Sequence, residues 1–283
     1  MATIYTPLRY PGGKSKLSGF VKTLFREHGL CDGHYVEPYA GGAGVALDLL
    51  MTEHAKVIHL NDLNYPLYAF WHTVINDSDS LCGRIRRCSL TVNAWRRHRN
   101  IVRNPLEHDI DQVGFSFLYL NRTNRSGIIN AGVIGGQDQS GNYKMDARFQ
   151  REELIARIER IAHYAHRIRI YNEDAVSFVE RIAAQIPVNS LIYLDPPYFV
   201  KGQRLYDNHY KSADHAAIAE VVSRVGTPWI VSYDNVPQIR ELYSNFRQTV
   251  YDLHYSAASS RTGSEVMVFS DFFAAPVEEI QVA

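Results

Sequence analysis

The chain alternates short apolar runs with segments of helical periodicity, and this alternation restricts the possible folds most. It occupies residues 34–74 and 169–243, on either side of a stretch of different character. Such alternation is typical of βαβ units, in which helices cover both faces of a parallel sheet. Two further runs predict an antiparallel hairpin at the sheet edge. The predicted strands are 34–37, 57–62, 169–172, 190–194 and 229–232, the predicted helices are 45–50, 66–74, 175–184, 213–225 and 236–243, and the hairpin strands are 248–255 and 265–271.

Acidic residues end or follow four of the predicted strands. These are Glu37, Asp62, Asp174 and Asp195. Ligands of open α/β sheets bind at the carboxyl ends of the strands, so we expect these side chains to line one crevice. Asp62 lies about twenty residues past a glycine loop, where such folds place an acceptor for ribose hydroxyls. Its alternative role is to cap the helix at 66–74.

The last of these acidic residues begins the sequence Asp195-Pro196-Pro197-Tyr198, directly after an apolar run. The carboxylate can accept one N–H bond from a flat exocyclic amine, and a carbonyl of the proline turn can accept the other. Tyr198 can stack on the ring that carries the amine. This grouping suits alkylation of a poorly nucleophilic amine, because its nitrogen is held in place for an electrophile. The simpler alternative is a strand followed by a proline turn.

Two glycine-containing segments are candidates for nucleotide-binding loops. The loop after Glu37 lacks the G-x-G-x-x-G spacing of dinucleotide-binding proteins, and an acidic residue there would repel a pyrophosphate. It suits a ligand with an amino group. The segment from Tyr10 to Ser15 lacks the first glycine of a phosphate-binding loop, which argues against an ATPase. Its backbone amides and Lys14 can still bind a carboxylate.

Positive charge is concentrated between residues 84 and 169, with sixteen Lys and Arg against eight Asp and Glu. Arg96, Arg97 and Arg99 lie beside Trp95, a pattern that fits binding to a phosphate backbone. The alternative is a solvated, arginine-rich helix face. Further along, a packed helix at 115–120 leads into a polar tip. Here arginine and asparagine side chains can read base edges, and Ile128 can wedge into the base stack.

Several of these motifs together carry a family resemblance. In order and distance, Tyr10–Lys14, Glu37–Gly42, Asp62 and Asp195–Tyr198 resemble the Dam-type (alpha-group, D12 class) DNA adenine N6-methyltransferases. The resemblance implies a Rossmann-like, S-adenosylmethionine-dependent methyltransferase sheet with helices on both faces. It also implies an inserted, mainly helical DNA-recognition subdomain at residues 76–168, between catalytic parts at 1–75 and 169–283.

The same resemblance implies that a methyl group passes from S-adenosylmethionine to the N6 amine of an adenine flipped out of double-stranded DNA. Asp195, Pro196, Pro197 and Tyr198 are then the catalytic residues. The expected cofactor-binding residues are Tyr10, Gly12, Lys14, Glu37, Pro38, Tyr39, Gly41, Asp62, Asp174 and Asp195. The expected DNA-binding residues are Arg96, Arg97, Arg99, Asn121, Arg122, Asn124, Arg125, Ile128 and Lys144.

Two other functions stay open at this point: methylation of cytosine N4, which is also an exocyclic amine, and DNA binding without catalysis on the same fold. We expect no metal, because the cysteines and histidines lack the spacing of a metal site. The sequence has no apolar stretch of membrane-spanning length and no signal core. We therefore expect a cytoplasmic protein, associated with the nucleoid through DNA and acting as a monomer or a weak dimer on DNA.

Overall fold

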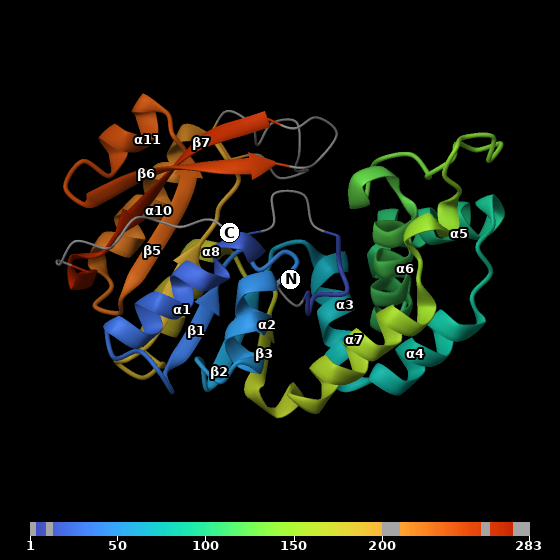
Figure 1. Ribbon diagram of the computed structural model, residues 1–283, viewed down its shortest axis with the longest axis horizontal. Coiled ribbons are helices and arrows are strands. Elements are labelled where there is room, and N and C mark those ends of the chain that lie inside the picture. The colour runs from blue at the N-terminus through green and yellow to red at the C-terminus, as the bar shows by residue number, and fades with distance from the viewer. Residues whose placement is uncertain (1–3, 10–13, 200–209, 256–260, 274–283) are drawn as a thin grey trace.

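The computed structural model of the protein describes residues 4–9, 14–199, 210–255 and 261–273. Its centre is a seven-stranded sheet with strand order β3-β2-β1-β4-β5-β7-β6 (Figure 1). Strands β1 to β5 run parallel, and β7 runs antiparallel to both of its neighbours. The strands are β1 (His34–Glu37), β2 (Val57–Asn61), β3 (Ile168–Tyr171), β4 (Leu191–Leu194), β5 (Trp229–Asp234), β6 (Arg247–Tyr255) and β7 (Arg261–Phe269).

Alternate residues of the strands enter two hydrophobic clusters, one on each face of the sheet. In β4, Leu191 and Tyr193 belong to one cluster, whereas Ile192 and Leu194 belong to the other. Successive side chains of a strand point to opposite faces, so a sheet covered on both sides needs such continuous apolar runs. Helices α1 (Ser18–Glu27) and α2 (Gly44–Met51) cover the first face, and α8 (Ala175–Ala183), α10 (Ser212–Arg224) and α11 (Pro237–Leu242) cover the second. The predicted α/β architecture is confirmed.

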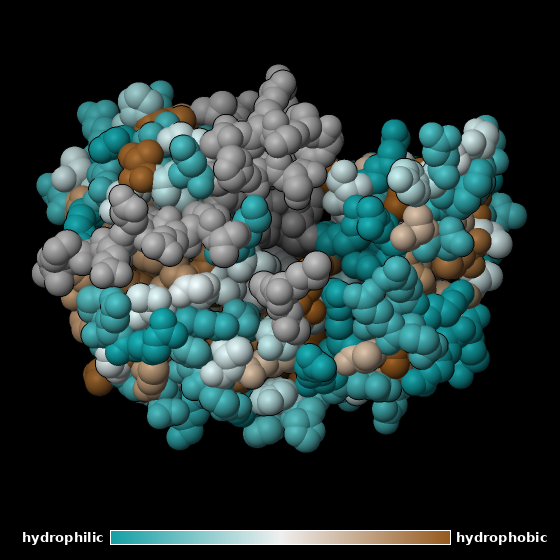
Figure 2. Space-filling view, viewed as in Figure 1, coloured by the Kyte–Doolittle hydropathy of each residue, from teal (hydrophilic) through white to brown (hydrophobic). Residues whose placement is uncertain are grey.

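The remaining helices form a lobe beside the sheet (Figure 1). They are α4 (Ser78–Arg87), α5 (Val92–Arg103), α6 (Ile110–Thr123) and α7 (Arg151–His163), joined to the sheet through α3 (Tyr65–Asn76). Helix α3 packs closely along α6 because Gly114 has no side chain: a Cβ there would lie 2.5 Å from the carbonyl oxygen of Ala69. Figure 2 shows mostly hydrophilic residues on the visible face of this lobe.

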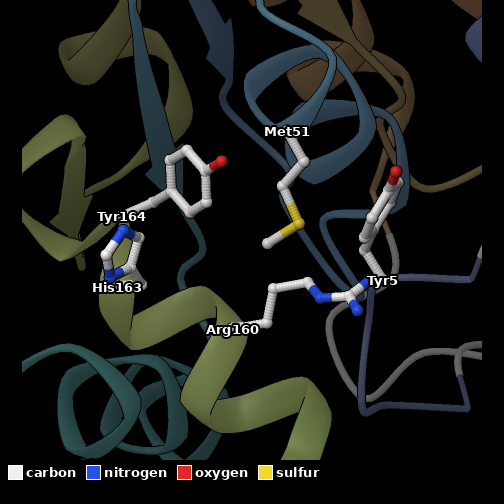
Figure 3. A pocket seen from close by; sticks show the side chains of 5 residues that line it. All are labelled: Tyr5, Met51, Arg160, His163 and Tyr164. Atoms are coloured by element: carbon white, nitrogen blue, oxygen red, sulfur yellow. The ribbon is translucent and has the colours of Figure 1, made fainter.

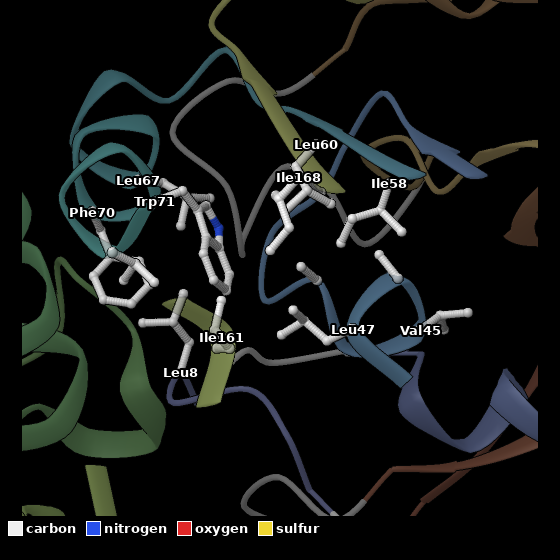
Figure 4. Packing of buried hydrophobic residues seen from close by; sticks show 14 of the residues in the cluster. Leu8, Val45, Leu47, Ile58, Leu60, Leu67, Phe70, Trp71, Ile161 and Ile168 are labelled. Atoms are coloured by element: carbon white, nitrogen blue, oxygen red, sulfur yellow. The ribbon is translucent and has the colours of Figure 1, made fainter. Parts of the chain in front are cut away.

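The lobe shares a core with one face of the sheet. Figure 4 shows Ile58 and Leu60 of β2, Phe70 and Trp71 of α3 and Ile161 of α7 in this packing. Buried residues of α6 and α7 belong to the same cluster as those of α1 and α2. The lobe is therefore held rigidly against the sheet by apolar packing.

Among the described residues, no helix combines the length and apolar character needed to cross a membrane.

Candidate active site

The strand order reverses between β1 and β4. From β1 the chain continues through β2 to β3 on one side, and from β4 it continues to β5 on the other. Open α/β sheets bind ligands at the carboxyl ends of the strands at this point, where the two connections leave in opposite directions. Glu37 ends β1, and Asp195 follows β4 directly. The two carboxyl groups that the sequence singled out thus lie on either side of the reversal.

Glu37 is buried, and only one of its two carboxyl oxygens accepts hydrogen bonds from the described residues. Its Oε1 accepts bonds from the Tyr35 hydroxyl at 3.1 Å and from the Ala46 amide of α2 at 3.2 Å. Oε2 makes no hydrogen bond with any of the described residues. Burial raises the pKa of Glu37 to about 8, the two hydrogen bonds oppose this rise, and the nearby Asp195 adds to it. A cationic ligand would reverse the effect of burial by favouring the carboxylate.

Asp195 is the more accessible of the two, with 24% of its side chain exposed. Its Oδ1 accepts a bond of 2.8 Å from the Ser232 hydroxyl of β5 and lies 3.5 Å from the Lys14 ammonium. Burial raises the pKa of Asp195 to about 6. Lys14 opposes the rise, and the carboxylate of Glu265 adds to it. With this pKa, Asp195 is mainly a carboxylate at neutral pH and becomes protonated at slightly lower pH.

Asp62 joins two loops of the crevice. Its carboxylate accepts bonds of 3.0 Å from the amide of Gly41, in the glycine loop, and from the amide of Asn64. Asn64, not Asp62, caps helix α3, because its side chain accepts the Leu67 amide at 3.1 Å. The capping role considered for Asp62 is therefore wrong. Burial raises the pKa of Asp62, and the two amide bonds oppose this rise.

The buried side chain of Asn61 ties three loops together, which the sequence analysis missed. Its amide nitrogen donates to the carbonyl oxygens of Pro38 and Glu173, both at 3.0 Å, and its oxygen accepts the Glu173 amide at 2.9 Å. Asp174 caps α8 through one oxygen, Oδ1, and is otherwise exposed. The Tyr39 hydroxyl bonds with that of Tyr210 at 2.9 Å.

The N-terminal segment reaches the same region. Gly44 begins α2 directly against Ser15, since a Cβ there would lie 2.2 Å from the Ser15 hydroxyl oxygen. Lys14 is 6% exposed and bonds with Tyr198 and with Glu265. Lys14, a predicted cofactor-binding residue, thus lies beside two of the predicted catalytic residues, Asp195 and Tyr198. The predicted cofactor residues Tyr10 and Gly12 lie outside the described residues.

Three of the predicted DNA-binding residues are buried and bonded to backbone atoms. Asn121 bonds to both backbone groups of Arg9 at 2.8 Å, and Arg122 donates to the carbonyl oxygens of Arg148 and Pro7. Asn124 donates to two carbonyl groups of the loop that follows it and accepts the Trp95 indole N–H. In this structure these three side chains are buried and bonded within the protein, and their contact with DNA stays a prediction. Their amide and guanidinium groups satisfy irregular backbone that no helix or strand would pair.

The other predicted DNA-binding residues reach the surface of the lobe. Arg96, Arg97, Arg125 and Lys144 are exposed, and Arg99 and Ile128 are half-buried. Arg99 lies over the Trp95 ring, 5.0 Å from its centroid. Within the described ranges, no group of three or more His, Cys, Asp or Glu side chains is arranged to hold a metal ion.

A separate hollow of about 470 Å³ lies between the end of α2 and α7 (Figure 3). It is lined by Tyr5, Met51, Arg160, His163 and Tyr164. It contains none of the predicted site residues, so we do not assign the cofactor to it.

The D12 class of N6 adenine-specific DNA methyltransferases matches residues 10–257. Retron Ec67 DNA adenine methylase of Escherichia coli is 26% identical over 277 residues, which cover 94% of this chain and 91% of that protein. Type II methyltransferase M.MjaIII of Methanocaldococcus jannaschii is 26% identical over 206 residues, or 68% of each chain. Among solved structures, a candidate RNA methyltransferase from Pyrococcus horikoshii has a TM-score of 0.43 at 8% identity, covering 95% of this chain and 87% of that one.

Proposed function

This chain belongs to the D12 class of N6 adenine-specific DNA methyltransferases, and we propose that it binds S-adenosylmethionine and a flipped adenine at the carboxyl ends of β1 and β4. The reaction is methylation of adenine N6 in DNA. The observation that carries the proposed site is the position of Glu37 and Asp195 on neighbouring parallel strands at the reversal of strand order. Glu37 would bind the cofactor, and Asp195 would accept a hydrogen bond from the target amine.

The chemistry of the acidic side chains fits the cofactor. When bound, S-adenosylmethionine supplies an electrophilic methyl group on its sulfonium. Oε2 of Glu37 would pair with the ammonium of the methionine part, and the buried position makes this pair strong. Asp62 would accept hydrogen bonds from the ribose hydroxyls of the cofactor. The second oxygen of Asp174 would accept one from the amine of the cofactor's own adenine. Gly41, with φ of +48°, lets the loop after β1 turn close to a ligand.

Asp195 would orient the target base. Its Oδ2 makes no hydrogen bond with any of the described residues and would accept one hydrogen of the target adenine's amine, while the Pro196 carbonyl would accept the other. Tyr198 would stack on the ring. As the N–C bond forms, the nitrogen becomes acidic and loses a proton. Asp195, with a pKa near 6, can take this proton and pass it to water, so a stronger base is not needed.

The helical lobe would bind DNA. Arg96, Arg97, Arg125 and Lys144 are its exposed cations among the predicted contacts, and Ile128 is the candidate wedge. Asn121 and Asn124 would hold the loop that carries Ile128, because they donate to the carbonyl oxygens of Gly127 and Ile128. We propose that the substrate is double-stranded DNA, that the protein acts in the cytoplasm on chromosomal DNA, and that it works as a monomer or a weak dimer.

Cofactor affinity should depend on pH through Glu37. The free enzyme holds Glu37 with a pKa of about 8, whereas the bound ammonium favours the carboxylate. Binding therefore releases a proton below pH 8, and the association constant should rise about tenfold per unit between pH 6 and 7.5. Calorimetry in buffers of different ionisation enthalpy measures the released proton. Glu37→Gln should bind weakly with a flat pH profile, and a flat profile for the wild type would contradict the assignment.

DNA affinity should depend on the exposed arginines of α5. Arg97→Ala should weaken binding to all DNA sequences alike and reduce the slope of log affinity against log salt by about one, because one phosphate contact is lost. Fluorescence anisotropy at several salt concentrations measures this slope. The matched control is Arg224→Ala on α10, where an exposed arginine pairs with Glu220. Equal slopes for the two variants would place the DNA elsewhere.

The function is tested with purified protein, S-adenosylmethionine and unmethylated genomic DNA. Digestion of the product to nucleosides separates N6-methyladenine from N4-methylcytosine, and sequencing of modified bases gives the target, with GATC as the first candidate. N6-methyladenine in one short motif is the expected result. Cofactor binding without any modified base would favour a silent DNA-binding protein instead.

A further inference from the structure

A buried cluster of polar side chains adjoins Asp195 and is centred on Glu265. The Glu265 side chain is fully buried in β7. Its Oε2 accepts bonds of 2.7 Å from the Lys14 ammonium and from the Tyr251 hydroxyl, and its Oε1 accepts the Tyr198 hydroxyl. None of the sequence motifs includes Glu265 or Tyr251. A buried carboxylate is expensive unless it is paired, so this position needs an explanation.

Sheet pairing places this carboxylate at the site. Tyr251 of β6 and Glu265 of β7 lie directly opposite each other in the antiparallel pair, which explains their bond. Tyr198 follows the proline turn after β4, and Lys14 comes from the N-terminal segment. Three segments far apart in the chain therefore converge on one carboxylate. Two of the side chains that it holds, Lys14 and Tyr198, are in the predicted active site.

The position of the lysine between two carboxylates shows what Glu265 can do. The Lys14 ammonium lies 2.7 Å from Glu265 Oε2 but 3.5 Å from Asp195 Oδ1. Glu265 is thus the closer partner. Without its charge, a buried ammonium would need another counter-ion, and Asp195 is the nearest carboxylate. A lysine paired tightly with Asp195 would occupy the acceptor that the target amine needs.

We propose that Glu265 is a positioning residue for methyl transfer, whose carboxylate keeps the Lys14 ammonium off Asp195 and fixes the Tyr198 ring through its hydroxyl before the adenine arrives. Glu265 does not touch the substrate in this arrangement. It acts through the cation beside the acceptor and through the ring that stacks on the base. Preorganised groups of this kind matter to the rate because they need not move during the reaction.

The test compares Glu265→Gln with the wild type in single-turnover methylation of a DNA duplex, using the full chain. This inference rests on the proposed function. We expect the rate of the transfer step at saturating S-adenosylmethionine to fall by about 10²-fold. The acid limb of the rate profile should also move to lower pH, because Asp195 loses a neighbouring negative charge and gains a closer ammonium. A purely structural role would not move this limb.

Glu220→Gln is the control, since it removes an exposed carboxylate of α10 outside the site. A rate and a pH profile for Glu265→Gln equal to those of the wild type would overturn the inference and leave the proposed function intact. A wild type that makes no N6-methyladenine would overturn both. If Glu265→Gln does not fold, Tyr198→Phe replaces it, because it removes only the hydroxyl that Glu265 holds. An unchanged rate for Tyr198→Phe would then contradict the proposal.

Discussion

Replacement of Asp195 by asparagine should slow methyl transfer to adenine by about 10²–10³-fold without unfolding the protein. An amide oxygen accepts a hydrogen bond more weakly than a carboxylate, and the amide N–H₂ of asparagine would oppose the target amine. The Ser232 hydroxyl can still donate to the new side chain, so the loop after β4 should keep its position. Single-turnover transfer of labelled methyl groups to duplex DNA measures the loss, and circular dichroism checks the fold.

The pH dependence separates this role from a general effect on folding. The pKa of Asp195 is about 6, so the wild-type rate should be constant above pH 7 and should fall by about tenfold per unit as the carboxylate is protonated below pH 6. Asp195→Asn should lack this limb. Asp32→Asn is the control, because Asp32 is exposed and lies before β1, at the amino ends of the strands. Its φ of +62° is one that asparagine tolerates. If Asp195→Asn methylated DNA as fast as Asp32→Asn, the proposed site would be wrong.

The local pattern of apolar and polar residues was sufficient to predict the sheet and the carboxyl groups at the carboxyl ends of its strands. A buried parallel strand such as β4 must be apolar on both faces, so Leu191–Leu194 can be recognised without knowledge of its neighbours. Because the carboxyl ends of parallel strands lie on the same side of the sheet, the residues at these ends lie close together. Glu37, Asp62 and Asp195 were predictable for this reason.

Residues whose role depends on distant partners were not predictable. Asn61 and Glu265 look like ordinary strand residues in the sequence, and only the pairing of strands brings them to Pro38, Glu173, Lys14 and Tyr198. The reverse case is Asn121 with Arg122 and Asn124, which the sequence places among the DNA contacts and which are buried in the structure. A polar sequence after an apolar helix fits a surface that reads DNA, but it equally fits a buried loop whose backbone needs side-chain partners. Composition alone does not distinguish these two cases.

The largest effect on stability is expected at Gly33, which lies directly before β1 and packs against the loop that leads into β4. A Cβ at this position would lie 1.8 Å from the carbonyl oxygen of Asn189, in the loop that leads into β4. The carbonyl oxygen belongs to the backbone and the added Cβ is fixed to it, so neither atom can rotate away. The segments before β1 and β4 must therefore move apart. Gly33→Ala should therefore lower the free energy of unfolding by about 3 kcal/mol, at the upper end of what overpacking costs. Urea denaturation followed by circular dichroism measures this.

Gly19→Ala provides the same chemical change with the opposite expected sign. Gly19 is exposed in the first turn of α1, and no atom lies within 4 Å of an added Cβ. Alanine restricts the unfolded chain and favours the helix, so this variant should gain about 0.5–1 kcal/mol. A loss at Gly33 together with a gain at Gly19 would show that steric contact with Asn189, not the loss of a glycine, decides the outcome. If Gly33→Ala were as stable as the wild type, the loops before β1 and β4 could not pack as closely as described, and the positions of Glu37 and Asp195 at the other ends of these strands would need revision.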